Sequence, residues 1–241
     1  MITLRGLRFR PPFWAWLLAA WALFLFGTLG MWQLHRGEFK AQWRAQIAAQ
    51  PPAPVPLAAS LPAPPEPALE HAVAEGRYES GRTLLQDGQS HDGRPGYHVW
   101  TPLRLATGGL AIVDRGWIPL ATQAAPLADV TTPPGAVRVR GYWRTLPKPG
   151  LRVGADKACE PAREFPAFVL YPTAADLRCA LGEPVLDGLL LLDPAESGGF
   201  VRAWADAGLP PERHYAYAAQ WFALGATAAI LFVVLNLKRG R

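Results

Sequence analysis

The chain is poor in the residues on which most hydrolytic, redox and metal chemistry depends. Its 241 residues include two cysteines, two methionines and four serines. No serine lies in a G-x-S-x-G nucleophile elbow. The run Ser90-His91-Asp92 is a polar turn, because the members of a catalytic triad must converge from separate segments. The sequence also lacks an H-E-x-x-H motif, a paired Cys/His zinc spacing and a glycine-rich phosphate loop. Nothing in these patterns argues for an enzyme, so a membrane-tethered enzyme is the least favoured class of function and we expect a protein that is not an enzyme.

Formal charge is missing from two long stretches, one near each end of the chain. The first is apolar from Phe13 to Leu34 and the second from about Tyr215 to Leu237. At about 1.5 Å per residue, a helix of roughly 20 residues spans the ~30 Å hydrocarbon core of a bilayer, and a helix satisfies its own backbone polar groups in lipid. We therefore predict membrane-spanning helices over residues 13–35 and 214–237. A cleaved signal peptide is the alternative for the first, but its length and its bulky end favour a retained anchor.

Basic residues flank both predicted spans on their outer sides. Arg5, Arg8 and Arg10 precede the first span, and Lys238, Arg239 and Arg241 follow the second, with no acidic residue in either tail. Short flanks rich in lysine and arginine stay in the cytoplasm. The tails, residues 1–12 and 238–241, are therefore expected to be cytoplasmic, and the chain between the spans is expected to be translocated. The net charge of +5 forms no basic stripe interleaved with aromatic residues, so nucleic acid is not an expected partner.

The two cysteines, Cys159 and Cys179, would lie in an oxidising compartment in this topology. Their separation is not that of a C-x-x-C motif, which argues against thioredoxin-like chemistry. The scarcity of methionine weakens a copper-carrier interpretation. A disulfide between the two cysteines and a pair of free thiols are both compatible with the sequence.

Residues 36–67 are predicted to contain a short helix and a spacer. In the helix, Phe39, Trp43 and Ile47 recur every four positions, which indicates one apolar face. The stretch 51–67 contains eight prolines, a composition typical of an extended polyproline segment. We expect a membrane-proximal helix followed by a proline-rich linker that leads to the folded domain.

Residues 68–213 have the pattern of a β-rich domain. Short apolar runs between glycine-containing turns predict strands at residues 83–86, 97–105, 110–118 and 189–192, and alternation predicts another over 137–144. A helix is indicated after Thr173, because Asp176 completes a capping box, and Gly182 ends it. The predicted fold is a membrane α-helical hairpin of two terminal spans around a mainly antiparallel β (α+β) domain, barrel-like or sandwich-like.

Histidines at the outer-leaflet ends of the two spans are the candidate functional residues. His35 ends the first span and His214 begins the second, so both are expected at the same level of a hairpin. His214, Tyr217 and Trp221 share one helical face, and an imidazole beside flat aromatic rings suits the axial ligation of a porphyrin iron. An interfacial aromatic belt has the same pattern, and the residues alone favour that interpretation.

Four segments, taken in order along the chain, resemble one family. They are Gly30-Met31-Trp32-Gln33-Leu34-His35-Arg36, then Gly93-Arg94-Pro95-Gly96-Tyr97 with Thr101-Pro102-Leu103, then Asp114-Arg115-Gly116-Trp117-Ile118-Pro119, and last His214-Tyr215-Ala216-Tyr217 leading to Trp221-Phe222. In this combination the whole chain resembles the Surfeit-locus ("Surf-one") family of cytochrome c oxidase assembly factors. Members often have asparagine where this chain has Asp114, which leaves the hydrogen bonding of that turn open.

The resemblance implies a function and a set of site residues. Family members are similar in having two transmembrane helices around a periplasmic or intermembrane-space domain, and bacterial members are reported to bind haem a. The chain would then lie in the bacterial inner membrane, with its central domain periplasmic, and would assist the insertion of haem a into the catalytic subunit of the oxidase. His214 would ligate the iron, and Tyr217 and Trp221 would contact the haem, so the resemblance favours a functional role for this face.

The resemblance also allows an alternative function, and it implies further partners and structural roles for several residues. A cofactor-free scaffold that stabilises an oxidase assembly intermediate is the alternative function. Haem a synthase and membrane lipid are further expected partners. Arg36 and Arg115 are expected to have structural roles, and contact with the anionic haem propionates is the alternative. Gly96 and Gly116 are expected in turns that need a positive φ. His35 matches a variable position of the family motif, so no role carries over to it.

Overall fold

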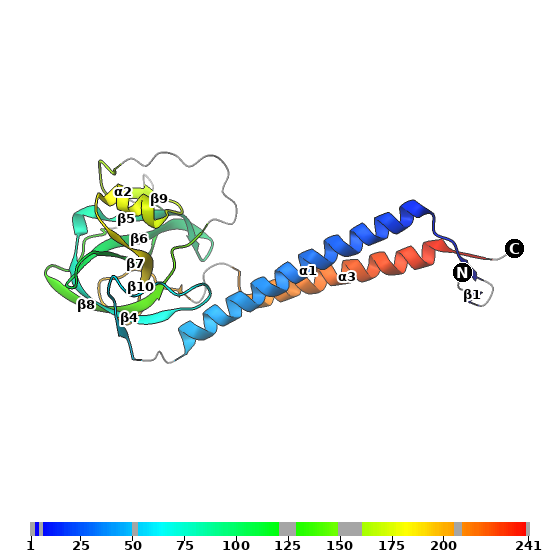
Figure 1. Cartoon of the computed structure of the whole chain (residues 1–241), viewed down its shortest axis with the longest axis horizontal. Coiled ribbons are helices and arrows are strands. Elements are labelled where there is room, and N and C mark those ends of the chain that lie inside the picture. Colours follow the sequence, from blue (N-terminus) through cyan, green and yellow to red (C-terminus); the bar gives the residue numbers. More distant parts are fainter. Residues whose placement is uncertain are drawn as a thin grey trace. The chain divides into compact units, whose positions relative to one another are not determined.

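The computed structural model describes residues 3–4, 7–49, 53–120, 129–148, 161–204 and 209–239. The chain divides into two compact units, one made of Met1–Gln42 with Leu209–Arg241 and the other of Trp43–Gly208. The first unit is mainly helical and the second is built on a β-sheet (Figure 1).

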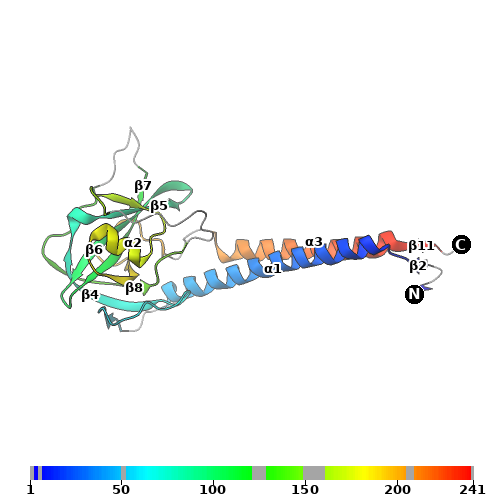
Figure 2. The ribbon, with the colours of Figure 1, turned by 45° about the horizontal axis from the view of Figure 1, so that its top comes forward.

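Two long helices dominate the first unit and run side by side (Figure 1, Figure 2). Helix α1 spans Phe13–Ala48 and helix α3 spans Pro211–Asn236, and both are long and apolar enough to cross a membrane. Large apolar side chains on them, such as Trp14, Phe24 and Leu235, are exposed. The core helices of a soluble protein would bury such side chains, so this exposure agrees with helices that face lipid.

Helix α1 continues well past the predicted end of the first span. The expected span and the expected membrane-proximal helix are one helix, which ends only at Ala48. The junction contains no proline, and residues such as Arg36, Glu38 and Lys40 are good helix formers. The change from apolar to charged composition marks where the helix can leave a membrane, and it does not interrupt the backbone hydrogen bonds.

A small sheet joins the two tails of the chain. Strands β1 (Thr3–Leu4), β2 (Leu7–Phe9) and β11 (Leu237–Arg239) pair antiparallel in the order β1-β2-β11. The ring of Phe9 packs edge-on against Trp16 and Phe232, with centroids 6.1 and 5.6 Å away. Strands of two or three residues carry too little periodicity to be predicted. The pairing places β2 and β11 at the same end of the helix pair (Figure 1).

The second unit is an eight-stranded sheet that closes on itself. Its strands are β3 (Val55–Pro56), β4 (Glu70–Tyr78), β5 (Leu84–His91), β6 (Arg94–Leu105), β7 (Leu110–Pro119), β8 (Ala136–Arg144), β9 (Ala167–Val169) and β10 (Val185–Leu192), in the order β3-β4-β8-β10-β7-β6-β5-β9. Because β4 also pairs with β6, the strands β4, β8, β10, β7 and β6 form a closed ring. Of the two architectures expected for this domain, the barrel is therefore the one observed.

The sheet is mixed, although most of its pairs are antiparallel. Strands β3–β4, β5–β9 and β7–β10 pair in parallel, whereas β4–β8, β8–β10, β4–β6, β5–β6 and β6–β7 are antiparallel. Strands β7 and β10 are buried along almost their whole length. A strand buried on both faces has a continuous apolar run in place of alternation. That pattern predicted these strands but did not reveal that they pair in parallel.

Two apolar layers lie on the two faces of this sheet. Small side chains, including Ala72, Ala74 and Ala111, belong to one layer with Trp143. The other layer is covered by helix α2 (Ala174–Leu181) and by the last turns of α1, which contribute Leu177 and Trp43 respectively. The Trp43 indole N–H donates to the carbonyl oxygen of Trp204 at 2.8 Å. The apolar face predicted for residues 36–49 therefore packs partly on the β domain.

Helix α2 has the ends that were predicted for it. Thr173 Oγ1 accepts a hydrogen bond from the Asp176 N–H at 3.2 Å, and the Asp176 carboxylate accepts one from the Thr173 N–H at 2.8 Å. Gly182 ends the helix in a left-handed conformation. Cys179 on this helix is disulfide-bonded, which decides against two free thiols, while Cys159 lies outside the described residues.

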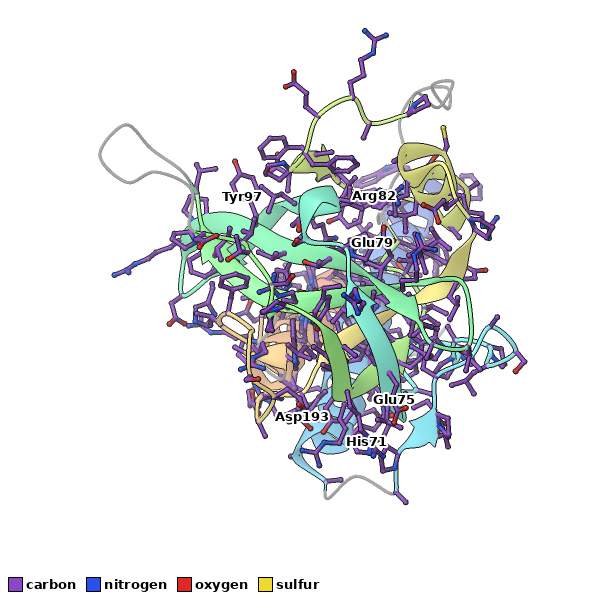
Figure 3. The ribbon with its side chains drawn as sticks, turned by 90° about the vertical axis from the view of Figure 1, so that its left-hand side faces the viewer. His71, Glu75, Glu79, Arg82, Tyr97 and Asp193 are labelled. Carbon is purple, nitrogen blue, oxygen red and sulfur yellow. The ribbon has the colours of Figure 1, made fainter. Side chains whose placement is uncertain are left out.

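An ion-pair cluster joins the end of α2 to the barrel. Arg82 Nη1 lies 2.7 Å from a carboxylate oxygen of Glu79 and 2.7 Å from one of Glu183, and Arg104 Nη2 lies 2.6 Å from Glu183. Figure 3 shows Glu79 and Arg82 close together on the barrel surface. Water screens these partly exposed charges, so each pair contributes little to the stability of the fold.

The proline-rich segment is part of the β domain, which differs from the predicted free spacer. Strand β3 pairs with β4, and the Leu57 N–H donates to the carbonyl oxygen of Val73 at 2.7 Å. Leu57 is buried, and Leu61 and Ala63 pack on the same layer. Proline keeps the backbone extended, and an extended segment can add to a sheet edge.

Candidate functional site

His214 lies in the seam between α1 and α3. Helix α3 begins at Pro211, a residue favoured in the first turn of a helix, and His214 follows one turn later. Only 7% of the His214 surface is exposed. Its Nδ1 atom lies 2.8 Å from the side-chain oxygen of Gln33 on α1. The candidate ligand is thus held by a residue 181 positions away in the sequence.

The hydrogen bond to Gln33 sets the tautomer of the imidazole. An amide oxygen can only accept a hydrogen bond, so Nδ1 of His214 carries the hydrogen and the lone pair lies on Nε2. Histidines that bind metals usually donate their other N–H in this way, which fixes the ring orientation. The His214 ring therefore presents one nitrogen that is suited to coordinate a metal.

Two glycines let the helices approach closely on either side of this hydrogen bond. A Cβ atom added to Gly37 would lie 2.6 Å from the ring of Tyr215, and one added to Gly30 would lie 2.5 Å from the ring of Phe222. Each ring therefore occupies a notch that only glycine leaves open. Both the glycines and the rings are seven residues apart, which is two helical turns.

The aromatic residues predicted to line a haem have different surroundings. Trp221 stacks on Phe26 of α1, with ring centroids 6.0 Å apart and planes inclined by 23°. Tyr217 has 39% of its surface exposed. His214 and Trp221 thus point toward α1, whereas Tyr217 lies on the outer part of the helix pair.

The structure does not bring His35 to His214. His35 is exposed, whereas Gly30, Gln33 and Gly37 of the same helix contact α3. Two residues along a helix correspond to a turn of about 200°, so His35 projects away from the face that carries Gln33. Arg36 is also exposed, and its guanidinium lies 5.0 Å from the centroid of the Phe39 ring.

The site residue that the sequence analysis missed is Gln33. Together with Thr28 it is one of two hydroxyl- or amide-bearing residues in the first apolar stretch. Polar residues inside a membrane span mark helix contacts or functional sites, which is the signal that could have singled it out. The equal spacing of the glycines and rings was a second available signal.

Arg115, in the Asp-Arg-Gly-Trp motif of the β domain, makes contacts that stabilise the fold. Arg115 is buried and donates from Nε to the carbonyl oxygen of Gly198, from Nη1 to that of Val130 and from Nη2 to that of Thr131, each at 2.8 Å. Its guanidinium also lies 5.0 Å from the centroid of the Phe200 ring. These contacts agree with the structural role expected for Arg115.

Gly96 and Gly116, both expected in turns, serve different purposes. Gly116 has a φ of +115°, as expected, and a Cβ there would lie 2.7 Å from the carbonyl oxygen of Val201. Gly96 lies in strand β6 and has no positive φ, so that expectation was wrong. A Cβ on Gly96 would lie 2.1 Å from the carbonyl oxygen of Ile118, so close approach of two backbones explains this glycine.

Asp114 organises a buried hydrogen-bond cluster. One carboxylate oxygen accepts hydrogen bonds from Nδ1 of His98 at 2.8 Å and from the indole N–H of Trp100 at 3.1 Å. The other oxygen accepts from the Gly116 N–H at 3.0 Å. Burial lowers the pKa of His98, but the charge of Asp114 and its hydrogen bond together outweigh that effect, so the pKa of His98 is raised.

At the helix seam, His214 would be the residue that holds a haem iron, through one imidazole nitrogen. His214 offers a neutral imidazole nitrogen, and in the described part of the chain no group of three or more His, Cys, Asp or Glu residues could hold a bare metal ion. The small exposed fraction of His214 means that a bound haem would displace side chains at the edge of the seam.

Comparison with known proteins agrees with the motifs. A family model described as the SURF1 family matches residues 20–226, a range that contains all four motif segments. No curated protein matches the chain. Members of this family are assembly factors rather than catalysts. Because the match covers most of its length, the chain belongs to the SURF1 family of cytochrome c oxidase assembly factors.

Proposed function

We propose that this assembly factor binds haem a transiently through Nε2 of His214 and passes it to the catalytic subunit of the oxidase, with no catalytic turnover of its own. The observation that carries the proposal is the hydrogen bond from His214 Nδ1 to Gln33, which leaves Nε2 as the coordinating nitrogen. Haem a is the cargo here, and the imidazole supplies one axial ligand to its iron.

The membrane topology proposed for this function is supported by both helices and tails. The exposed apolar surfaces of α1 and α3 suit lipid. The pairing of β2 with β11 supports a topology in which both tails are on one side of the bilayer, and their arginine and lysine residues favour the cytoplasm. The β domain would then lie in the periplasm, where the disulfide at Cys179 is chemically expected.

Replacing His214 with Ala tests the carrier function directly. Wild-type protein purified from cells that make haem a should show haem absorbance. The haem absorbance of the His214→Ala variant should be lower than that of the wild type by a factor of at least about ten. Oxidase activity in the cells should fall, while the membrane level of the protein stays unchanged. His35→Ala is the matched control, because His35 is exposed on the outer face of α1 and should keep the haem.

The scaffold function is the outcome if the carrier function fails. The β domain exposes Phe168 and Leu170, with 62% and 54% of their surfaces accessible, and such residues could contact an assembly intermediate. If the wild-type protein from haem-a-producing cells has no haem absorbance, the carrier proposal is wrong. Polar substitutions at Phe168 and Leu170 should then impair oxidase assembly, whereas His214→Ala should not.

A further inference from the structure

We infer that Gln33 is a positioning residue for His214: by accepting the Nδ1–H it sets which nitrogen, and which edge of the imidazole, is presented to haem iron. The inference rests on the proposed haem-carrier function and deepens it. The Nδ1–Oε1 distance of 2.8 Å is that of a well-formed hydrogen bond, and the acceptor comes from the other helix.

Gln33 differs from Thr28 and Thr227, two other polar residues within the apolar stretches, in where its hydrogen bond goes. Thr28 and Thr227 donate to the carbonyl oxygens of Phe24 and Ala223, each four residues earlier on the same helix, at 2.9 and 2.8 Å. Gln33 instead bonds across the seam to His214. A polar group in an apolar setting costs free energy unless it is paired, so these two side chains depend on each other.

The helix pair does not need this hydrogen bond to stay together. The rings of Tyr215 and Phe222 fill the notches at Gly37 and Gly30 on either side of it, and Trp221 stacks on Phe26. This packing is apolar and would remain if Gln33 were replaced by an apolar side chain of similar size. A positioning role can therefore be separated from a purely structural one.

The chemistry of the acceptor also sets how strongly the imidazole donates to iron. A neutral amide oxygen polarises the Nδ1–H bond less than a carboxylate would, so the imidazole stays neutral and its donor strength moderate. Moderate donor strength suits a cargo that must be released. A carboxylate at position 33 would keep the tautomer and strengthen the iron–nitrogen bond.

Two variants of the full-length protein in detergent test the inference. Gln33→Met keeps the side-chain volume but removes the acceptor, and Gln33→Glu keeps an acceptor. In apo protein with ring-15N histidine, wild type and Gln33→Glu should show His214 protonated at Nδ1, whereas Gln33→Met should show a mixture of tautomers. Titration with haem a should give affinity about 10- to 100-fold weaker for Gln33→Met and unchanged or tighter for Gln33→Glu. Thr28→Val, which removes a polar group on the same helix, should leave both measurements unchanged.

The possible results separate the inference from the function on which it rests. If wild type binds haem and Gln33→Met binds it with the same affinity and spectrum, Gln33 has no positioning role and the carrier function stands. If both variants lose affinity equally, volume or local packing decides, and the inference is again wrong. If wild type binds no haem a, the carrier function and the inference fail together.

Discussion

At the scale of single residues, two histidines show how a hydrogen-bond partner decides what an imidazole can do. His214 donates to a neutral amide and keeps a free lone pair, which is the state needed for coordination. His98 faces the carboxylate of Asp114, which also accepts from Trp100, so its pKa is raised. The first partner leaves the lone pair of His214 on Nε2, whereas the second favours a charged pair between His98 and Asp114, which joins strands β6 and β7.

The raised pKa of His98 predicts a pH-dependent stability. A group whose folded-state pKa lies above its unfolded value near 6.5 contributes its full stabilisation below that value and loses it as the pH rises through the folded-state pKa. The unfolding temperature of the wild type, followed by near-ultraviolet circular dichroism, should therefore decrease as the pH rises above about 6.5 and through the folded-state pKa of His98.

The matched variant for this prediction is His98→Gln, which can still donate a hydrogen bond to Asp114 but does not titrate in this range. Its unfolding temperature should depend less on pH than that of the wild type, and the two curves should converge at high pH. Parallel curves over the whole range would show that His98 does not carry the effect.

At the scale of the elements, the helix seam depends on glycines that receive rings. Gly30→Leu should lower the free energy of unfolding of the helix pair by about 1–3 kcal/mol, because the new side chain meets the ring of Phe222. Gly27→Leu is the control, since a Cβ at Gly27 has no neighbour within 4 Å. Both changes gain the same helix propensity, so their difference in unfolding midpoint in mixed micelles isolates the packing at the seam. Equal midpoints for the two variants would show that packing at Gly30 does not stabilise the helix pair.

At the scale of the whole molecule, the proposed topology puts both tails on one side of the membrane and the β domain on the other. A reporter that is active only in the periplasm should work when inserted after Thr107, in an exposed turn between β6 and β7. The same reporter should be inactive when fused after Arg241, because basic flanks stay in the cytoplasm. The reverse pattern would overturn the periplasmic location of the β domain.

The amino-acid sequence by itself determined the features that depend on local pattern. The absence of charge over a sufficient length predicted both long apolar helices, and the Thr173–Asp176 capping box with Gly182 predicted both ends of α2. The apolar runs of β7 and β10 predicted two central strands. Each of these features depends on neighbours within a few residues, because helix periodicity, capping and strand burial are local.

Only the tertiary structure decided which distant residues meet. The parallel pairing of β7 with β10, the closure of β4 onto β6 and the addition of the proline-rich β3 to the sheet join segments with no shared sequence pattern. The hydrogen bond between Gln33 and His214 also joins distant segments. It depends on the rotation and depth at which the two helices pack. Rings seated in glycine notches set that rotation, and the identity of His214 alone could not reveal which of its nitrogens is free.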